Sequence, residues 1–345
     1  MTLSATSLLT ADELAKVRAR SDIKGVLCVV HAWGVILAAT ALFAMAPNPL
    51  TWAIAIVVIG ARQLGLAVLM HDAAHGILTN NKRLNDILGQ VFCAWPVVTD
   101  MYPYRTYHLQ HHRWTQQKDD PDLALSAPFP ITPRSLKRKV IRDLTGQTTF
   151  KQRTAQLRSA LGKPGMALKD RVRNFVKRLG GPLLMNGVLL GGLITAGYGY
   201  LYLALWVLPF FTWFPMITRV RNIAEHAVVP DNDDPFRNAR TTKAGWFMRA
   251  VLAPYWVNFH VEHHLLMYVP CYNLPKLHAL LIAHGCGPKM ELQPNYWAVL
   301  RMAASKPATA MDTGEDSAAE PANNHGAGLA IEVTPRVDML TAAQG

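Results

Sequence analysis

The chain of 345 residues has few charged side chains, which make up 17% of the residues, whereas hydrophobic residues make up 50%. In soluble globular proteins about 25% of residues are charged. The sequence also has few cysteines, and none of them forms a CxxC pair; they are Cys28, Cys93, Cys271 and Cys286. The sequence therefore contains no iron–sulfur or zinc-ribbon motif and no pattern typical of a disulfide scaffold.

Long stretches without charge are present instead. Residues 25–45 are 21 uncharged residues, which as a helix would extend about 31 Å, enough to cross a bilayer core. A second apolar run, residues 50–70, follows after four residues and includes Arg62 and Gln63. A third tract, residues 181–217, is too long for one crossing and has a turn signal, TAGYGY, near its middle. We predict an all-α integral membrane protein with four transmembrane helices in two hairpins.

The formal net charge of +12 is unevenly distributed. Between residues 100 and 178 there are 17 Lys and Arg but 6 Asp and Glu, an excess typical of cytoplasmic loops. We expect the basic stretches 134–139 and 171–178 to lie on anionic lipid headgroups or, alternatively, to form a solvated helix face. No nucleic-acid-binding module accompanies the charge, so nucleic acid is not an expected partner. The predicted location is a bacterial inner membrane, with both termini on the cytoplasmic side.

Three regions are expected along the chain. Residues 1–24 form a cytoplasmic N-terminal segment, residues 25–304 form the membrane domain with a cytoplasmic helical cap, and residues 305–345 form a disordered tail rich in Ala, Pro, Gly and acidic residues. Residues 87–98, ILGQVFCAWPVV, are too short to cross a membrane and are predicted to be re-entrant or interfacial.

Histidines are concentrated in three short motifs. Residues three and four apart on a helix share a face, so a helical motif of this spacing directs its imidazoles the same way. The two-hairpin topology places all three motifs on one side of the membrane. The motifs are HxxxH at His71 and His75, HxxHH at His108, His111 and His112, and HxxHH at His260, His263 and His264.

The number of imidazoles favours two metal ions. Histidine is the commonest metal ligand, and imidazole binds iron, copper, zinc and nickel. The motifs supply eight imidazoles, and His226, after the last apolar tract, supplies a ninth, whereas one octahedral ion accepts six at most. Asn222 lies four residues before His226 and is expected to hold a water near the metal. We expect His31 to be buried and hydrogen-bonded, and His278 and His284 to be structural; His325 is given no role.

Two other kinds of metal protein, a zinc hydrolase and a metal transporter, also contain clustered histidines. In a zinc hydrolase, HDAAH would correspond to HExxH with Asp72 in place of the general-base Glu, but a hydrolytic zinc uses about three protein ligands. This stays as a remote alternative. A metal transporter is disfavoured because the motifs follow the apolar runs and do not lie within them. A pair of redox-active irons that activates O2 for attack on a lipid accounts best for the number, type and location of the histidines.

These motifs resemble those of the membrane fatty acid desaturase superfamily, which also contains lipid hydroxylases, alkane hydroxylases and carotenoid ketolases. That superfamily has three histidine boxes, HxxxH or HxxxxH, HxxHH or HxxxHH, and H/QxxHH. They are matched here by His71–His75, His108–His112 and His260–His264. A further histidine of the family, preceded four residues earlier by an asparagine, is matched by His226 and Asn222. The resemblance extends over about residues 25–290.

The resemblance implies that all nine histidines bind two iron ions and that Asn222 acts through water. It implies that O2 is reduced with two electrons from outside and that hydrogen is removed from a fatty acyl chain carried as a lipid or a thioester. Loss of a second hydrogen gives a double bond, whereas return of oxygen gives hydroxylation or ketolation of a lipid, alkane or carotenoid, which is the alternative outcome. Because His260 begins the third box and no HPGG motif occurs, we expect a separate ferredoxin-like or rubredoxin-like electron donor. The basic face suits an acidic partner.

Side chains beside the motifs are candidates for orienting the ligands or the substrate. Asp72 and Glu262 lie between predicted ligands and are candidates for hydrogen bonds to imidazoles or, alternatively, for plain surface or cap roles. Three acidic residues follow the second motif and are candidates either for orienting ligands or for forming a turn: Asp119, Asp120 and Asp122. Trp95, Trp114 and Trp256 are candidates for an acyl tunnel or for interfacial anchors.

Overall fold

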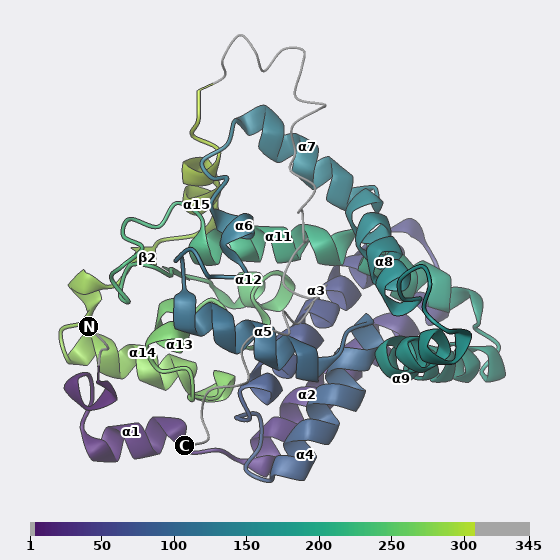
Figure 1. Ribbon diagram of the computed structural model, residues 1–345, viewed down its shortest axis with the longest axis horizontal. Helices are drawn as coiled ribbons and strands as arrows, with labels where there is room; N and C mark the ends of the chain where they lie inside the picture. The colour runs from purple at the N-terminus through teal and green to yellow at the C-terminus, as the bar shows by residue number, and fades with distance from the viewer. Residues whose placement is uncertain (1–3, 308–345) are drawn as a thin grey trace.

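The computed structural model describes residues 4–307, and this part of the chain is largely helical (Figure 1). The α-helices are α1 (Ala11–Arg18), α2 (Asp22–Met45), α3 (Pro49–Ala74), α4 (Lys82–Ile87), α5 (Met101–Trp114), α6 (Leu123–Ser126), α7 (Pro133–Leu144), α8 (Gln147–Ala160), α9 (Leu168–Thr195), α10 (Leu208–Phe211), α11 (Trp213–His226), α12 (Trp246–Val251), α13 (His260–Leu265), α14 (Leu274–Ala283) and α15 (Tyr296–Ala303). Shorter helical pieces are η1 (Ala5–Ser7), η2 (Leu88–Ala94), η3 (Trp95–Val97), η4 (Tyr202–Val207), η5 (Pro254–Trp256), η6 (Cys271–Asn273) and η7 (Gly287–Lys289). The predicted tail, residues 305–345, lies outside the described residues from 308 onward.

The first predicted hairpin is present as α2 and α3. Asn48 begins α3: its side chain accepts hydrogen bonds from the backbone N–H groups of Leu50 and Thr51, and Pro49 occupies the first helical position. The two helices pack along each other. Of the most apolar 18-residue window, 72% is buried in α3 but 22% in α2. Helix α3 is therefore the central helix and α2 is peripheral.

Three helical stretches are long and apolar enough to cross a membrane: Asp22–Met45, Pro49–Ala74 and Tyr202–His226. The predicted turn near residues 195–200 is confirmed, because α9 ends at Thr195 and helix resumes at Tyr202. Helix α9 is not among the three stretches. Its apolar part, residues 181–195, extends about 22 Å, and the four-span arrangement stays a prediction.

The basic stretch 171–178 belongs to the same helix as the third apolar tract, since α9 runs without interruption from Leu168 to Thr195. The other basic stretch, residues 134–139, lies in α7, and α8 separates α7 from α9 along the chain (Figure 1). Asp143 at the end of α7 is fully buried and its Oδ1 accepts a hydrogen bond of 2.9 Å from Arg219 Nη2 of α11. This ion pair holds α7 against the helix that ends at His226.

The all-α prediction misses one small feature. Two-residue strands β1 (Thr241–Thr242) and β2 (Leu292–Gln293) pair in parallel. Both threonines are almost completely buried, so their backbone groups need hydrogen-bond partners that a neighbouring segment must provide. The pairing anchors the loop after α11 and so helps to position α13, whose Val261 N–H donates to Thr241 Oγ1 at 3.2 Å.

Helix α5 is attached to the end of α3 by Arg105. Its Nε donates to Ala74 O at 2.7 Å and its Nη2 to Ala73 O at 3.0 Å. These carbonyls belong to the last turn of α3, where the regular helical hydrogen bonds end, and the Ala73 carbonyl also accepts from the Gly76 N–H and from Asn85. The cationic side chain also suits the negative end of the helix dipole. The first and second histidine motifs are thereby fixed relative to each other.

Candidate metal centre

All nine predicted histidines gather into two groups, although they come from four helices. The ligand nitrogens of each group lie within 4.8 Å of one another. One group has five members: His71, His75, His108, His112 and His263. The other has four: His111, His226, His260 and His264. We call them the five-histidine group and the four-histidine group.

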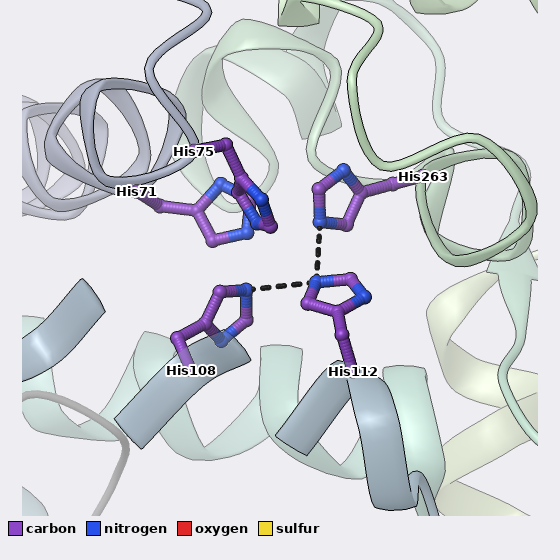
Figure 2. Close-up of side chains that lie close together, drawn as sticks. All are labelled: His71, His75, His108, His112 and His263. Atoms are coloured by element: carbon purple, nitrogen blue, oxygen red, sulfur yellow. Dashed lines mark hydrogen bonds between the residues drawn. The ribbon is translucent and has the colours of Figure 1, made fainter. Parts of the chain in front are cut away.

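In the five-histidine group the rings face one another from three helices (Figure 2). His71 lies in the last turn of α3 and His75 caps that helix; His108 and His112 lie one turn apart on α5, and His263 lies on α13. The Nε2 atoms of His108 and His112 are 3.0 Å apart, as are those of His112 and His263. The group joins elements separated by more than 180 residues of sequence.

The four-histidine group lies on the same two helices and on the end of α11. His111 follows His108 by three residues on α5, and His260 and His264 are one turn apart on α13. The Nε2 atoms of His226 and His260 are 2.8 Å apart, and those of His260 and His264 are 3.1 Å apart. Because α5 and α13 each supply both groups, the groups are neighbours, and the rings of His112 and His264 stack at 4.3 Å between centroids.

These nitrogen separations match a shared metal ion. With metal–nitrogen bonds of about 2.1 Å, two ligands at right angles have nitrogens about 3.0 Å apart. Two buried nitrogens of the five-histidine group, His71 Nε2 and His75 Nε2, have no hydrogen-bond partner among the described residues. Buried polar atoms normally have a partner, and a metal ion would provide one here. The residues therefore fit metal ions, one in each group.

Burial keeps most of these imidazoles in the neutral form that binds metal. It lowers the pKa of His75 to about 3, with further contributions from the charges of His111 and Arg105. Burial likewise holds the pKa values of His108, His112, His260, His263 and His264 well below 6.5. His111 differs: burial lowers its pKa, but the carboxylates of Asp120 and Asp122 outweigh this and raise it.

Hydrogen bonds to the second ring nitrogen orient several imidazoles. Asp120 Oδ1 is 2.8 Å from His111 Nδ1, and both side chains are buried. Asp72 Oδ1 is 3.3 Å from His71 Nδ1, while its Oδ2 accepts from the Cys271 N–H at 2.7 Å. Such partners fix the tautomer and direction of a metal ligand. Asp72 and Asp120 thus have the orienting role that was one of the two alternatives for each, and Asp120 also accepts hydrogen bonds from backbone N–H groups of its turn.

The other acidic candidates have different contacts. The Glu262 carboxylate is bound by Thr241 and His278, so it orients no imidazole of the cluster, and it is buried, so the alternative of a surface role is not observed either. Helix α13 turns Glu262 away from its neighbours His260 and His263. Asp122 accepts from the Tyr107 hydroxyl and its Oδ2 is 3.8 Å from His111 Nδ1. Asp119 is exposed and contributes a backbone carbonyl to Gln110.

Sequence reasoning missed three partners of the four-histidine group and the arginine that binds one of them. Thr115 Oγ1 is 3.2 Å from His264 Nδ1, and the Asn238 carbonyl is 3.2 Å from His226 Nδ1. Glu225 Oε1 is 3.7 Å from His260 Nδ1 and accepts from Arg221 Nε at 2.5 Å. The i,i+4 spacing of Arg221 and Glu225 was a visible signal for that pair. The backbone carbonyl and the threonine carry no signal in the sequence.

Asn222 lies beside the four-histidine group, in the wall of a cavity of about 40 Å³ that His111, His226 and His260 also line. A water needs about 10–15 Å³ of such space and two or more polar partners. The cavity is large enough, and Asn222 and Glu225 line it. This geometry is compatible with an interaction through water, which stays a prediction.

The remaining histidines lie outside the two groups. His31 is hydrogen-bonded to the Tyr255 hydroxyl at 3.0 Å, but it is exposed, not buried as predicted, because α2 is a peripheral helix. His278 contacts Glu262, and His284 Nε2 is 3.0 Å from Glu13 Oε2, which ties α14 to α1. His325 lies outside the described residues.

The three tryptophan candidates do not share one site. Trp95 packs so closely on Gly181 of α9 that a Cβ there would be 2.2 Å from its Cε2. Trp114 is 38% exposed, with Arg113 over its ring. Trp256 lines a cavity beside α2 and α3.

Comparison with known proteins agrees with this geometry. The family model described as fatty acid desaturase matches residues 47–290. Dihydrorhizobitoxine desaturase of Bradyrhizobium elkanii is 26% identical over 265 residues, 74% of this chain and 74% of that protein. Chloroplastic omega-6 fatty acid desaturase of Spinacia oleracea is 24% identical over 309 residues, 78% of this chain but 63% of that protein. Zeaxanthin 4-ketolase of Chlamydomonas reinhardtii is 26% identical over 221 residues, 61% of this chain and 40% of that protein.

Proposed function

The chain belongs to the fatty acid desaturase family, whose members are oxidoreductases, and we propose that it desaturates a fatty acyl chain at a membrane. The acyl chain would be carried as a lipid or a thioester. One observation carries the proposal: nine imidazoles from four helices form two adjacent groups whose nitrogens are spaced as ligands of shared ions. Three apolar helical stretches support an association with the membrane.

All nine histidines would hold two iron ions. Bound iron would supply the oxidising power, drawn from O2 and two external electrons, that removal of hydrogen from an unactivated C–H bond requires. Nine neutral nitrogen ligands suit iron. A single tetrahedral zinc takes four ligands, fewer than the five-histidine group offers, which leaves the zinc hydrolase a remote alternative.

The protein's own contribution is to orient the imidazoles and to bury them. Asp120 and Asp72 direct His111 and His71, and Arg105 fixes α5 against the end of α3. Burial keeps the imidazoles deprotonated without a bound ion, so metal binding need not displace protons from most of them. Asn222 would hold a water beside the four-histidine group.

The charge of the chain bears on the surroundings of the reaction. A bacterial inner membrane with the histidine groups on the cytoplasmic side fits the basic character of residues 100–178. The same charge would attract an acidic electron donor, ferredoxin-like or rubredoxin-like.

Oxygen insertion is the second candidate reaction. It is favoured by the likeness to a ketolase, which is as close in identity, 26%, as the likeness to dihydrorhizobitoxine desaturase. The same metal ligands serve both outcomes, because the difference lies in how the substrate chain is placed over the ions. A lipid, alkane or carotenoid would then be hydroxylated or ketolated.

Lipid profiling tests the proposal. The chain is expressed in a host of known lipid composition, and membrane lipids are analysed by mass spectrometry. Loss of two hydrogens from an acyl chain is the expected result, and gain of one oxygen would identify the alternative. His263→Ala is expected to abolish the product, whereas His284→Ala, a histidine outside both groups, serves as the matched control. Product from His263→Ala at the wild-type level would contradict the ligand assignment.

A further inference from the structure

A cavity of about 770 Å³ lies between α2, α3 and α12, away from the histidine groups. Its size is within the range of small-molecule sites, roughly 300–1,000 Å³. None of the nine clustered histidines lines it. It is therefore a site distinct from the candidate metal centre, although α3 contributes to both.

The cavity holds a buried cation from the middle of α3. Arg62 is 5% exposed and lies nine residues before His71, about 14 Å along the helix. Its Nη2 donates to the Ala250 carbonyl at 2.6 Å, and its guanidinium lies 5.7 Å from the Tyr255 ring centroid. Arginine stays protonated, and a charge within an apolar membrane helix is costly unless it has a function or a partner.

Among the described residues, the cavity wall contains no carboxylate to neutralise Arg62. Besides Arg62, the charged or titratable side chains of its described lining are basic or weakly acidic: Lys24, His31 and Arg249 are basic, and Cys28, Tyr255 and Tyr272 are weakly acidic. Lys24 lies over the Tyr272 ring at 5.4 Å. A described lining with the three cationic side chains of Lys24, Arg62 and Arg249, and with no Asp or Glu, attracts an anion.

The remaining wall is apolar and partly exposed on the surface of the molecule. Leu27, Val35 and Val58 come from the two membrane-spanning candidates α2 and α3, and Trp246 begins α12. Leu27 is 58% exposed and Trp246 is 77% exposed. An occupant with an apolar chain and an anionic end satisfies both parts of the wall.

The aromatic wall is held in an unusual backbone conformation. Tyr255 and Trp256 have φ values of 53° and 57°, which residues other than glycine rarely adopt. Gly65 permits this placement, since a Cβ there would be 2.8 Å from Tyr255 Cε2. The Tyr255 hydroxyl donates to the Cys28 carbonyl at 3.0 Å and accepts from His31 Nδ1 at 3.0 Å. Such strain is characteristic of functional sites and supports a ligand-binding wall.

We propose that this cavity binds a membrane-dissolved amphiphile with a small anionic head group, carboxylate or phosphate, whose head is bound by Arg62. Lys24 and Arg249 add positive charge around the head, and the apolar wall of α2 and α3 covers the chain. The head group has two possible sources, a single-chain acid or a bilayer phospholipid. The site depends on this cavity and not on the proposed desaturation.

The test measures binding of radiolabelled hexadecanoate to the purified full-length protein in a non-ionic detergent. Hexadecanol of the same chain length is the uncharged comparison. We expect saturable binding, about tenfold or more tighter for the acid, because hydrogen bonds to charged groups are worth about one to two orders of magnitude in affinity. Competition by hexadecyl phosphate or by phosphatidylglycerol then separates the two sources of the head group.

Arg62→Met is expected to bring the acid and the alcohol to within about twofold, and Arg62→Lys to keep part of the difference. Arg301→Met, which removes a charge from the exposed face of α15, is the matched control and should leave the ratio unchanged. Val35→Trp fills the apolar wall and should weaken binding of both probes, which keeps the test decisive if Arg62→Met fails to fold. Equal affinity for acid and alcohol in the wild type, or unaltered binding in Val35→Trp, would overturn the proposal.

Discussion

The two histidine groups differ in how the protein holds their imidazoles. In the four-histidine group every Nδ1 has a polar neighbour, at 2.8 Å for His111, 3.2 Å for His226 and His264, and 3.7 Å for His260. In the five-histidine group His71 has Asp72 at 3.3 Å, and neither ring nitrogen of His75 is hydrogen-bonded to a described residue. The first arrangement is set by the protein, whereas the second relies more on the bound ion. The four-histidine group should therefore bind its ion more tightly.

The largest effect is expected from loss of a ligand in either group. His75→Ala should lower iron content to about one ion per chain, because the better-oriented group keeps its own. His260→Ala removes a nitrogen that lies about 3 Å from those of His226 and His264. Because the four-histidine group should bind its ion more tightly, this variant should lower the iron content further. Product should fall more than about 100-fold in both, beyond the cost of losing an outer hydrogen bond. Iron is measured by mass spectrometry and product by lipid analysis; equal iron loss in the two variants would remove the contrast between the groups.

The next effect concerns the orienting carboxylate of the four-histidine group. Asp120→Asn should weaken iron binding at that group about 10- to 100-fold, the usual cost of losing such a partner. Asp119→Asn is the matched control, because Asp119 is exposed and its side chain is outside the cluster. Competition with a chelator measures both affinities. Asp120 would have no orienting role if the two variants released iron equally.

The corresponding change in the five-histidine group should cost less. The Asp72–His71 contact is 0.5 Å longer than that of Asp120 and His111, so Asp72→Asn should weaken iron binding less than about tenfold. Asp72 also accepts from the Cys271 N–H, and the variant should lose about 1 kcal/mol of folding stability. Chelator competition and thermal unfolding separate the two effects. A larger loss of iron than in Asp120→Asn would reverse the comparison.

A separate effect is a pH dependence of the metal-free protein. The pKa of His75 is about 3 in the folded state and about 6.5 in the unfolded state, so between these values the unfolded chain binds more protons. Stability therefore rises with pH in this window and is lost as the pH falls below about 6.5. The melting temperature of chelator-treated protein should decrease from pH 7 to pH 5. A melting temperature that stays level or increases would show that these imidazoles accept protons in the fold.

Sequence spacing was sufficient to identify eight of the nine histidines, because helical periodicity places i, i+3 and i+4 on one face whatever the surrounding fold. His226 was identified by its place after the last apolar tract and four residues after Asn222. It did not divide them into groups. His111 belongs with His226, while its neighbours His108 and His112 belong with His75, and this depends on the crossing of α5 with α11 and α13. Long-range packing of this kind leaves no local signal.

The errors have a common cause. Glu262 lies between two ligands in sequence, yet its carboxylate is used by Thr241 and His278, which the chain brings in from elsewhere. His31 was expected to be buried because its run is apolar, but burial depends on which helix becomes central. The same apolar composition gives a central α3 and a peripheral α2. Composition determines that a helix is apolar; tertiary packing determines what it contacts.

Anomalous diffraction at the iron absorption edge, from crystals of the iron-loaded protein, tests the two-ion arrangement most directly. Two peaks are predicted, one about 2.1 Å from the nitrogens of the five-histidine group and one equally close to those of the four-histidine group. A single peak bound by three or four histidines, with the other group left without metal, would contradict the account.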